Sequence, residues 1–519
     1  MRILFCSVLF LAVLGPVLTF TRLFQLKEWR ADRLREHLRR EGWMRQFFGW
    51  ARPAIIVLGL IFSLLLPLLS EEWRVEPGTL LLATWGLLAW FTLFRFVIGA
   101  QQRPVFTAKT LAVVILALGF LLPAGVSSLL FRETAWGIVL LFLLPLLAPF
   151  SVIAAVLVLL PLDRILKRRV LARARALRAK HPHLTVIGIT GSVGKTTTKE
   201  LLAHLLSSQK VLVTPAHVNT ELGVAHLLLG KLREEHELLI VEMGAYRRGE
   251  IASLCSLVAP EIGVITYVGD QHLALFGSKE NLCRAKGELF AALPPKGHAF
   301  LNADSLLCSD IASRAPCPVQ TVGTGGHATH EAYAIEESAS GISFTLQNVR
   351  FQLPIHGTHQ VNNVLLAVAV AALLGVSLEE SAQRLATFQG LSQTFEKKTG
   401  RHGQTLIDDT HNASSASFRA AIEWARIHPA MKKILVASPL MELGEAEKPI
   451  CRELGFCARD VFDAVMFLDK KCAQYFEGGY GQPVFVPRRK NFKFPPFDEQ
   501  TLIVCEGRMP KTLLERLLS

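Results

Sequence analysis

The residues best suited to chemistry form one short turn, Gly191-Ser192-Val193-Gly194-Lys195-Thr196. An apolar run precedes the turn, and a helical pattern begins at Lys195. Glycines let backbone N–H groups approach phosphate oxygens, and the first turn of a helix adds positive potential. The amine of Lys195 can reach terminal phosphates, and the Thr196 hydroxyl can bind Mg²⁺. The predicted phosphate-binding residues are Gly191, Ser192, Val193, Gly194, Lys195, Thr196 and Thr197.

The turn meets the short pattern TGxxGKT after a strand and departs from the longer phosphate-loop pattern. Ile189 stands where GxxxxGK[ST] needs its first glycine. The alternative is therefore an ordinary glycine turn that binds no ligand. The residues that follow distinguish this turn from a phosphate-binding loop.

Four polar residues follow the turn, each beside a predicted strand or helix. Glu242 ends a strand, at the sheet edge where a hard cation beside phosphates needs oxygen ligands. His272 lies in the loop after the next strand, Lys286 begins a helical run, and Asn302 follows another strand. Taken singly, they have ordinary alternatives: a surface acid, a packing histidine, a solvated lysine and a turn-forming asparagine.

Short apolar runs alternate with helical patterns from Leu184 onward, which predicts an α/β fold around a parallel sheet. Polar, glycine-rich sequence from Gly323 to Gly357 predicts a small antiparallel insertion, and a helix follows over Val361–Leu374. The predicted strands of this part are Thr185–Thr190, Lys210–Thr214, Leu238–Met243, Glu261–Tyr267 and His298–Asn302.

A second α/β cycle begins near Leu391, so we place a domain boundary at about residue 390. Its predicted strands are Gln404–Asp408, Lys433–Ala437, Ala464–Leu468, Val484–Val486 and Thr501–Cys505. Its predicted helices are Ala416–Ile427, Pro449–Val461 and Pro510–Leu518.

The first third of the 519-residue chain is apolar over longer stretches. Five runs precede residue 163, each close to or above the ~17–25 residues that span a bilayer. Seven of the eight tryptophans lie here, several near the ends of the runs, where interfacial aromatic residues are favoured. The predicted spans are Ile3–Phe20, Ala54–Ser70, Thr79–Gly99, Leu111–Phe131 and Thr134–Leu162.

The loops between these runs predict an orientation. Residues 21–53 carry nine Lys/Arg against four acidic residues, and residues 163–183 carry a second basic cluster. Because basic loops stay on the cytoplasmic side, we expect the N-terminus outside, five spans, and the remainder in the cytoplasm. A cleaved secretory signal over the first run is the alternative. Residues 21–53 form either an amphipathic helix on anionic lipid or a solvated loop.

The net charge of +13 is mostly juxtamembrane, which indicates topology and lipid contact and predicts no nucleic-acid partner. The nine cysteines include no CxxC pair and no Cys/His metal spacing, so we expect them to be packing residues.

In order and spacing, the motifs resemble those of the Mur ligase family, which uses ATP to make peptide bonds in cell-wall precursors. The likeness runs from about residue 186 to residue 515 and is closest to the MurF type, which adds D-alanyl-D-alanine to UDP-N-acetylmuramoyl-tripeptide. The motifs are GITGSVGKTTTKELL, VEMGAYRRGEI, HLALFGS, RAKGELF, LNADS, GTHQVNNVLLAVAVAALLGVSLEE, LIDDTHNASSASFRAAI, LMELGE and IVCEGR.

The resemblance implies the cofactors ATP and Mg²⁺ and a role for each residue. Thr196 and Glu242 would bind one Mg²⁺, and His272 with Lys286 would bind a second. Lys286 is carbamylated in this family, which makes chemical sense because a carbamate presents two oxygens while an ammonium cannot ligate a cation. The implied catalytic residues are Lys195, Lys286 and His272.

The resemblance also implies contacts to nucleoside and substrate. Asn302 would face the adenine and Asp409 would meet the ribose. Asn219 would lie near the substrate, with His411 and Asn412 at the cleft between the domains.

The implied enzyme is an ADP-forming carboxylate–amine ligase that works through an acyl phosphate. Its partners would be a cell-wall peptide precursor or other carboxylate acceptor, an amino acid or dipeptide as amine donor, and the lipid bilayer.

The chain departs from the family pattern at Thr394, where an arginine is usual, and at Tyr267, where asparagine is common. Five predicted spans also stand in place of the family's uridine-nucleotide-binding first domain.

These departures leave two alternatives, a membrane ligase like poly-γ-glutamate synthase and a catalytically weakened scaffold of cell-wall assembly. The predicted architecture is an α-helical membrane region followed by α/β domains, at the inner (cytoplasmic) membrane. It comprises a membrane domain at 1–162, a basic juxtamembrane linker at 163–183, a P-loop, ATP-binding Mur ligase central domain at 184–390 and a Rossmann-like C-terminal domain at 391–519.

Overall fold

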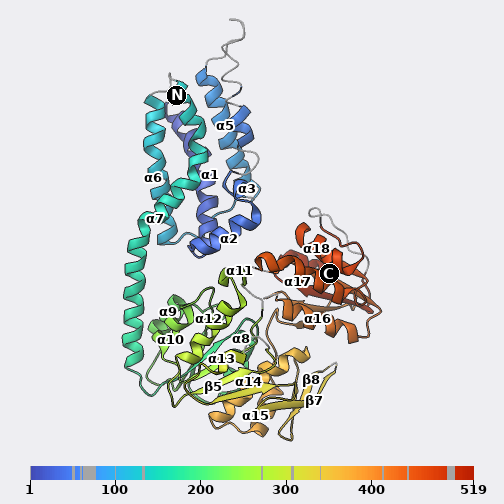
Figure 1. Cartoon of the computed structure of the whole chain (residues 1–519). Coiled ribbons are helices and arrows are strands. Elements are labelled where there is room, and N and C mark those ends of the chain that lie inside the picture. Colours follow the sequence, from blue (N-terminus) through green and yellow to red (C-terminus); the bar gives the residue numbers. More distant parts are fainter. Residues whose placement is uncertain are drawn as a thin grey trace. The chain divides into compact units, whose positions relative to one another are not determined.

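The computed structural model describes residues 2–48, 53–58, 61, 77–99, 101–130, 135–269, 273–305, 309–338, 340–411, 414–440, 443–487 and 497–519. The chain divides into two compact units, Met1–Arg168 and Arg169–Ser519. Figure 1 colours the chain from blue at the N-terminus to red at the C-terminus.

The first unit is helical, with a core of apolar side chains that includes Val17, Trp85, Val113 and Val152. Among its described residues, the helices are α1 (Arg2–Leu26), α2 (Ala31–Glu41), α3 (Trp43–Phe48), α5 (Pro77–Val97), α6 (Ala108–Leu130) and the first part of α7 (Ala135–Ala179).

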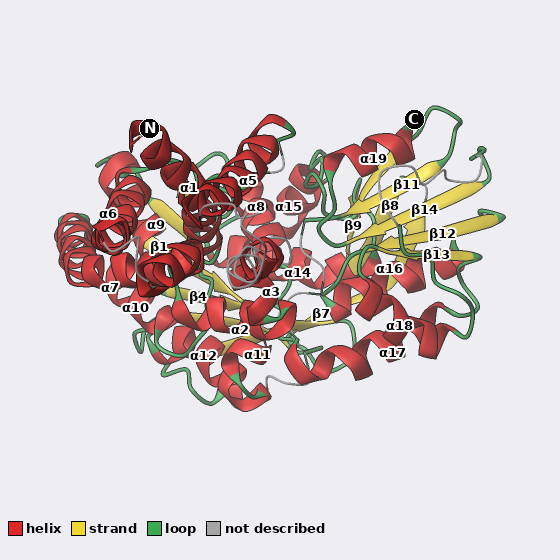
Figure 2. Ribbon diagram, turned by 90° about the horizontal axis from the view of Figure 1, so that it is seen from above, coloured by secondary structure: helices red, strands yellow, loops and turns green. Residues whose placement is uncertain are grey.

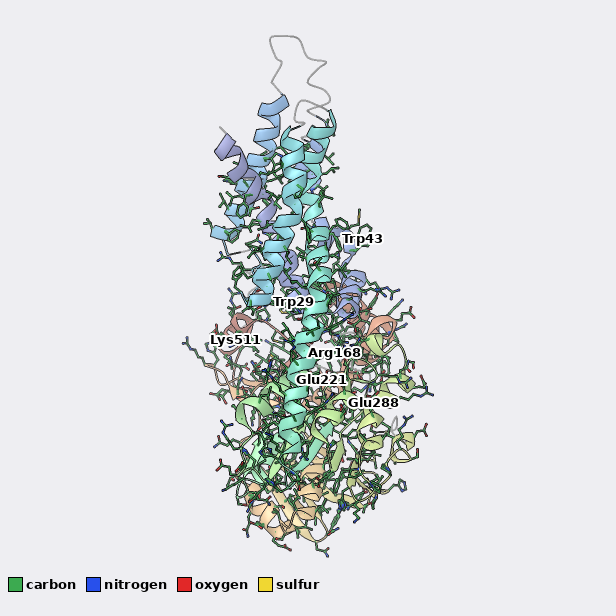
Figure 3. All side chains as sticks on the ribbon, turned by 90° about the vertical axis from the view of Figure 1, so that its left-hand side faces the viewer. Trp29, Trp43, Arg168, Glu221, Glu288 and Lys511 are labelled. Carbon is green, nitrogen blue, oxygen red and sulfur yellow. The ribbon has the colours of Figure 1, made fainter. Side chains whose placement is uncertain are left out.

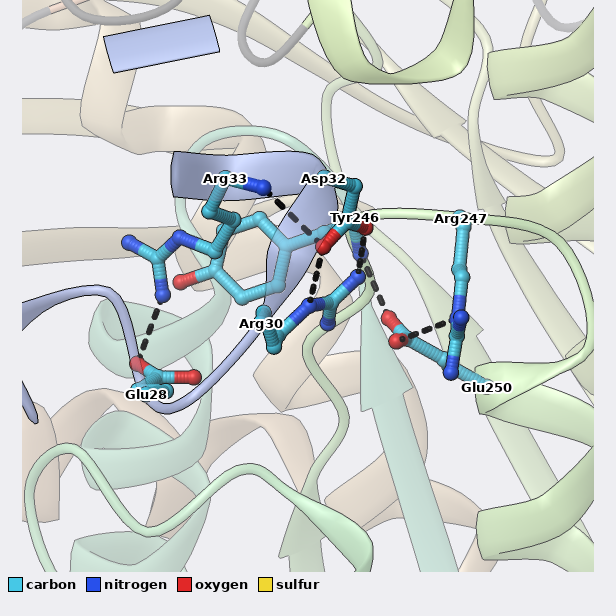
Figure 4. Close-up of polar contacts among 7 residues, drawn as sticks. All are labelled: Glu28, Arg30, Asp32, Arg33, Tyr246, Arg247 and Glu250. Atoms are coloured by element: carbon cyan, nitrogen blue, oxygen red, sulfur yellow. Dashed lines mark hydrogen bonds and ion pairs between the residues drawn. The ribbon is translucent and has the colours of Figure 1, made fainter. Parts of the chain in front are cut away.

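Ion pairs fix the turn that joins α1 to α2. Arg30 contacts Asp32 at 2.6 Å, and Arg33 contacts Glu28 at 2.7 Å (Figure 4). This turn lies in the basic segment 21–53, so part of that segment's charge is neutralised locally, within the first unit.

Two described stretches, Ser7–Leu26 in α1 and Leu143–Ala179 in α7, are long and apolar enough to cross a bilayer. Buried core helices and signal sequences share this length and composition, so these two helices do not by themselves establish a membrane domain. The second predicted span, Ala54–Ser70, lies mostly outside the described residues. The five-span topology therefore stays a prediction.

Helix α7 continues past the last predicted span and through most of the basic segment 163–183, past Arg168 (Figure 3). Leucine, alanine and arginine, all good helix formers, dominate this stretch. Its last turns belong to the second unit, where Leu171 and Ala174 are buried. Arg178 donates to the carbonyls of Val258, His181 and Leu184 at 2.9, 2.6 and 3.1 Å.

The second unit begins with a nine-stranded sheet in the order β2-β3-β1-β4-β5-β6-β7-β8-β9. The strands are parallel up to β7, and the pairs β7–β8 and β8–β9 are antiparallel. The strands are β1 (Thr185–Thr190), β2 (Val211–Val213), β3 (Leu238–Glu242), β4 (Ile262–Ile265), β5 (His298–Asn302), β6 (Val319–Gly323), β7 (His330–Ser338), β8 (Gly341–Leu346) and β9 (Val349–Leu353). The predicted antiparallel insertion thus extends the main sheet.

Helices cover both faces of this sheet, because alternate strand residues point to opposite sides. Val186 of β1 belongs to the core under α9, α10 and α12, whereas Ile187 and Ile189 belong to the core under α8, α14 and α15. The helices are α8 (Lys195–Leu205), α9 (Glu221–Lys231), α10 (Glu250–Val258), α11 (Leu273–Phe276), α12 (Lys279–Ala291), α13 (Ser309–Ala312), η4 (Thr358–Gln360), α14 (Val361–Leu373) and α15 (Leu378–Leu385).

A second sheet follows, in the order β10-β11-β14-β12-β13, with β10 antiparallel to β11 and the other pairs parallel. Its elements are β10 (Glu396–Thr399), β11 (Thr405–Asp409), α16 (Ser415–Ile427), β12 (Lys432–Ala437), η5 (Gly444–Ala446), α17 (Glu447–Ala458), β13 (Ala464–Phe467), α18 (Lys470–Tyr480), β14 (Thr501–Glu506) and α19 (Lys511–Leu518). Helices α16 to α18 cover one face and α19 the other (Figure 2).

The sequence reasoning missed β6, β10 and α18, and the predicted strand Val484–Val486 is only a single bridge, between Met466 and Phe485. Strand β10 reads Glu-Lys-Lys-Thr and lacks an apolar pattern, because it is an edge strand. It is fixed by the ion pair of Lys398 with Asp408 on β11, at 2.6 Å.

Candidate active site

The phosphate loop joins the end of β1 to the start of α8. Gly191 has φ 149° and Gly194 has φ 88°, conformations that favour glycine. A Cβ at Gly191 would collide with the Thr266 hydroxyl, and a Cβ at Gly194 with the side-chain oxygen of Asn363. Both positions therefore need glycine, as expected where backbone must approach a ligand closely.

Lys195 lies over this loop. Its Nζ donates to the carbonyl oxygens of Gly191 and Ser192, both at 2.8 Å. Burial lowers the pKa of Lys195, and the nearby Glu242 carboxylate opposes that shift. The amine is therefore held beside the loop that it is predicted to serve.

Glu242, at the carboxyl end of β3, is the centre of a buried polar network. Its Oε2 accepts from the Thr196 hydroxyl at 2.9 Å, and its Oε1 accepts from Asn219 Nδ2 at 3.1 Å. The predicted metal ligands Thr196 and Glu242 and the predicted substrate residue Asn219 are thus brought together. Two hard oxygen atoms at the N-terminus of a helix fit Mg²⁺ that also contacts phosphate.

Two further residues of this network were missed by the sequence reasoning. Lys199 is fully buried, with its Nζ 3.7 Å from Glu242 Oε2 and donating to Thr214 O at 2.8 Å. The Thr214 hydroxyl accepts from the Glu242 backbone N–H at 3.0 Å. Lys199 lies three residues after Thr196, so the helical period could have indicated it.

Lys286 is buried on α12. Burial, together with the positive charge of Lys195, lowers the pKa of its amine to about 7, against opposing effects of Glu250 and Glu288. These carboxylates are held nearby: Glu250 accepts from Tyr246 N at 2.8 Å and pairs with Arg247 at 3.2 Å (Figure 4), and Glu288 accepts from Gly249 N at 2.6 Å. His272, the predicted companion of Lys286, lies outside the described residues.

Asn302 is buried at the end of β5, and its Oδ1 accepts from the backbone N–H of Asp304 at 3.0 Å. Asn302 thus stabilises the turn after β5, which is the structural role considered above as the alternative to ligand binding. This role leaves the predicted adenine contact untested.

Asp409 ends β11 of the second sheet and accepts from Phe395 N at 3.2 Å. Burial raises its pKa to about 7. The predicted contact of Asp409 with a ribose remains a prediction, like the other predicted nucleoside and substrate contacts.

Two histidines from different parts of the second unit stack on each other. The rings of His217 and His411 lie 5.1 Å apart at 22°. Burial, followed by the charges of His217 and Arg508, lowers the pKa of His411, while Glu242 opposes the shift. His411 therefore lies near enough to Glu242 to feel its charge, and its place in a cleft remains a prediction. Asn412 falls outside the described residues. His217 was missed, although it lies two residues before Asn219.

Comparison with known proteins agrees with this geometry. Residues 189–371 match the family model of the Mur ligase middle domain. The UDP-N-acetylmuramoyl-tripeptide–D-alanyl-D-alanine ligase of Bacillus subtilis (strain 168) is 33% identical over 298 residues, 56% of this chain and 64% of that protein. The ligase of the same name from Escherichia coli (strain K12) is 33% identical over 297 residues, 55% of this chain and 65% of that protein. The chain thus matches less than two thirds of these relatives' length.

Solved structures extend the likeness beyond the middle domain. MurF from Acinetobacter baumannii superposes with a TM-score of 0.60 at 28% identity, covering 68% of this chain and 79% of that one. The MurF ligase of Thermotoga maritima in complex with ADP has a TM-score of 0.59 at 26% identity, covering 68% of this chain and 82% of that one. Residues 189–371 are therefore similar to a Mur ligase middle domain and lie within an α/β region that shares the MurF fold.

Proposed function

We propose that the chain is an ATP-dependent, ADP-forming carboxylate–amine ligase of the Mur type. The observation that carries the proposal is the cluster at the phosphate loop, where Lys195 lies over the loop and the Thr196 hydroxyl donates to the buried Glu242 carboxylate. A glycine loop, a lysine and two oxygen ligands at one helix N-terminus are the parts that a phosphoryl transfer needs. The ADP complex of the similar ligase from Thermotoga maritima supports the choice of nucleotide.

The proposed substrates follow the relatives' names: a muramoyl peptide as carboxylate acceptor and D-alanyl-D-alanine as amine donor. The helical first third of the chain supports a second candidate, a membrane ligase like poly-γ-glutamate synthase. The same helical region also supports a carboxylate acceptor that is linked to a lipid and not to UDP.

In the proposed mechanism, the substrate carboxylate attacks the γ-phosphorus and ADP leaves. An amine then attacks the acyl phosphate and displaces phosphate. Lys195 would neutralise charge on the transferring oxygens, and the backbone N–H groups of the loop would hold the phosphates. Mg²⁺ held by Thr196 and Glu242 would supply further charge neutralisation.

Lys286 would contribute as a carbamate. A carbamate forms when a neutral amine attacks CO₂ and releases one proton. A pKa of about 7, caused mainly by burial, leaves a large fraction of the Lys286 amine neutral near pH 7. The carbamate oxygens, together with His272, would provide the second metal site.

We further propose that the helical unit crosses the inner membrane several times and that residues 169–519 lie in the cytoplasm. Most of the large exposed apolar side chains among the described residues precede residue 169, such as Trp90, Ile115 and Leu122. Apolar side chains on the outside of a helical unit favour contact with lipid.

Purified full-length protein in detergent, with ATP, Mg²⁺ and separate acceptors, tests the function. We expect phosphate release with UDP-muramoyl-tripeptide plus D-alanyl-D-alanine, and its loss in Lys195→Ala. A glutamate-dependent ladder of products would instead favour the poly-γ-glutamate-type ligase. Absence of phosphate release with every acceptor, in wild type and in Lys195→Ala alike, would contradict the enzyme and favour the scaffold.

A further inference from the structure

Two carboxyl groups lie side by side at the carboxyl end of the second sheet. Asp409 ends β11 and Glu506 ends β14, and the two residues are register partners on adjacent parallel strands. Asp409 is 5% exposed and Glu506 is fully buried. The proposed mechanism assigns no role to Glu506.

The pair is short of hydrogen-bond donors. Asp409 Oδ1 accepts from Phe395 N at 3.2 Å. Among the residues that the structure describes, no N–H or hydroxyl donor reaches either side-chain oxygen of Glu506. The group placed to share a hydrogen bond with Glu506 is the Asp409 carboxyl itself. Such a bond between two carboxyls requires one proton.

The surrounding charges do not neutralise the pair. Strand β10 presents Glu396 and Lys398, but Lys398 is engaged by Asp408 at 2.6 Å and by Glu396 at 3.0 Å. Strands β11 and β14 add Asp408 and the thiol of Cys505, and Arg508 follows β14. Burial, and then the proximity of Asp409, raises the pKa of Glu506 well above its usual range. Like charges in a dry site cannot both ionise near neutral pH.

We propose that Glu506 is a positioning residue that shares one proton with Asp409, so that the pair carries a single negative charge when nucleotide binds. This inference rests on the proposed function, in which Asp409 meets the ribose. The protonated partner donates to the other carboxyl, and Asp409 keeps lone pairs free for a sugar hydroxyl. Loss of the shared proton at higher pH places two charges in the dry site and weakens the binding of an anionic nucleotide.

The test compares MgADP binding to wild type and Glu506→Gln by calorimetry between pH 7 and pH 9.5, on the full chain in detergent. The wild-type Kd should rise with pH, by at most tenfold per pH unit for one proton. The Kd of Glu506→Gln should rise less with pH than that of wild type, because the amide donates to Asp409 at every pH and only other groups such as Lys286 still titrate. Any protonation of MgADP itself changes the Kd of both proteins by the same factor, so it does not affect the difference between their pH profiles.

Glu447→Gln is the matched control, because Glu447 is also a buried glutamate of this domain and pairs with Lys471 at 2.9 Å, away from Asp409. It should keep the wild-type pH dependence. An equal pH dependence of the Kd in wild type and Glu506→Gln would overturn the inference.

A second measurement is independent of nucleotide. The Asp409–Glu506 pair keeps its shared proton in the folded protein, whereas the same carboxyl groups lose their protons near pH 4 in the unfolded chain. The folded state therefore binds more protons above pH 4, and the pair makes the free energy of unfolding fall as pH rises. Glu506→Gln and Asp409→Asn should each reduce this fall relative to wild type. Failure of wild type to bind MgADP would count against the proposed function, whereas unchanged urea-unfolding profiles in both variants would count against the shared proton.

Discussion

Lys286 combines deep burial with a neighbouring positive charge, and both act on its amine. We predict that Lys286→Ala loses ligase activity and that added bicarbonate does not restore it, because no amine remains to form a carbamate. Phosphate release measured with and without bicarbonate checks this. Lys279→Ala, an exposed lysine of the same helix, is the control and should remain active. A fully active Lys286→Ala would remove the carbamate from the mechanism.

The same lysine makes stability depend on pH. Its pKa is lowered to about 7 in the folded protein, mainly by burial, and is ~10.4 in an unfolded chain. Between these values the unfolded chain binds the extra proton, so this group makes the free energy of unfolding rise with pH. We expect Lys286→Met to lack that contribution, measured as the difference between the urea-unfolding profiles of variant and wild type from pH 7 to pH 10. Parallel profiles would show that the folded amine is not perturbed.

Lys199 is fully buried, and its Nζ lies 3.0 Å from the Glu200 carboxylate and 3.7 Å from the buried Glu242 carboxylate. Removing one partner from a buried charge pair costs about 3–5 kcal/mol, so Lys199→Met should lower the free energy of unfolding by that order. Mg²⁺ can replace the lost positive charge, so added Mg²⁺ should stabilise the variant more than wild type. Lys199→Arg, which keeps the charge, is the control. Equal Mg²⁺ effects in wild type and Lys199→Met would contradict a metal at Glu242.

At the scale of elements, a buried contact joins β7 to α16 and so joins the two sheets of the second unit. Glu337 Oε1 accepts from Trp424 Nε1 at 2.5 Å and from Gly357 N at 2.9 Å, and His356 Nδ1 lies 3.3 Å away. Phe395, in the segment between the sheets, packs edge-on against Trp424. These contacts fix the helix α16 against the first sheet.

We predict that Trp424→Phe lowers the free energy of unfolding by about 1–3 kcal/mol, because the buried Glu337 carboxylate loses a donor. Denaturant unfolding of Trp424→Phe, Glu337→Gln and the double variant measures the coupling between the two side chains. Tyr333→Phe, which removes an exposed hydrogen bond on the same strand β7, is the control and should have little effect. Additive effects of the two substitutions would mean that the Trp424–Glu337 bond contributes no stability.

At the scale of the whole molecule, the five-span topology makes a prediction that needs no nucleotide. Fluorescent-protein fusions after residues 48, 103 and 183 should be bright, because these points are predicted to be cytoplasmic. Alkaline phosphatase fusions after residues 75 and 133 should be active, because these points are predicted to be external. Activity of a phosphatase fusion after residue 183 would place the nucleotide site outside the cell and end the proposed function.

Elements with a strong local pattern could be predicted from sequence. Strands β1 and β5 have the predicted limits, because each is a continuous apolar run bounded by polar residues or a glycine turn. Strand β10 and the extension of α7 could not be predicted in the same way. The polar residues of β10 form a strand because they pair with β11, where Lys398 contacts Asp408. The basic end of α7 is helical because Leu171 and Ala174 pack into the core of the second unit.

The sequence by itself determined the phosphate loop, because its glycines, Lys195 and Thr196 are local and adjacent. It also indicated a resemblance to the Mur ligase family, because several motifs occur in order over a long stretch, and residues 189–371 match the middle-domain model. Only the tertiary structure decided which distant side chains share a buried environment. Lys199 with Glu242, His217 with His411, and Asp409 with Glu506 each join elements far apart in the chain. Burial and charge pairing depend on such contacts, and the order of residues does not record them.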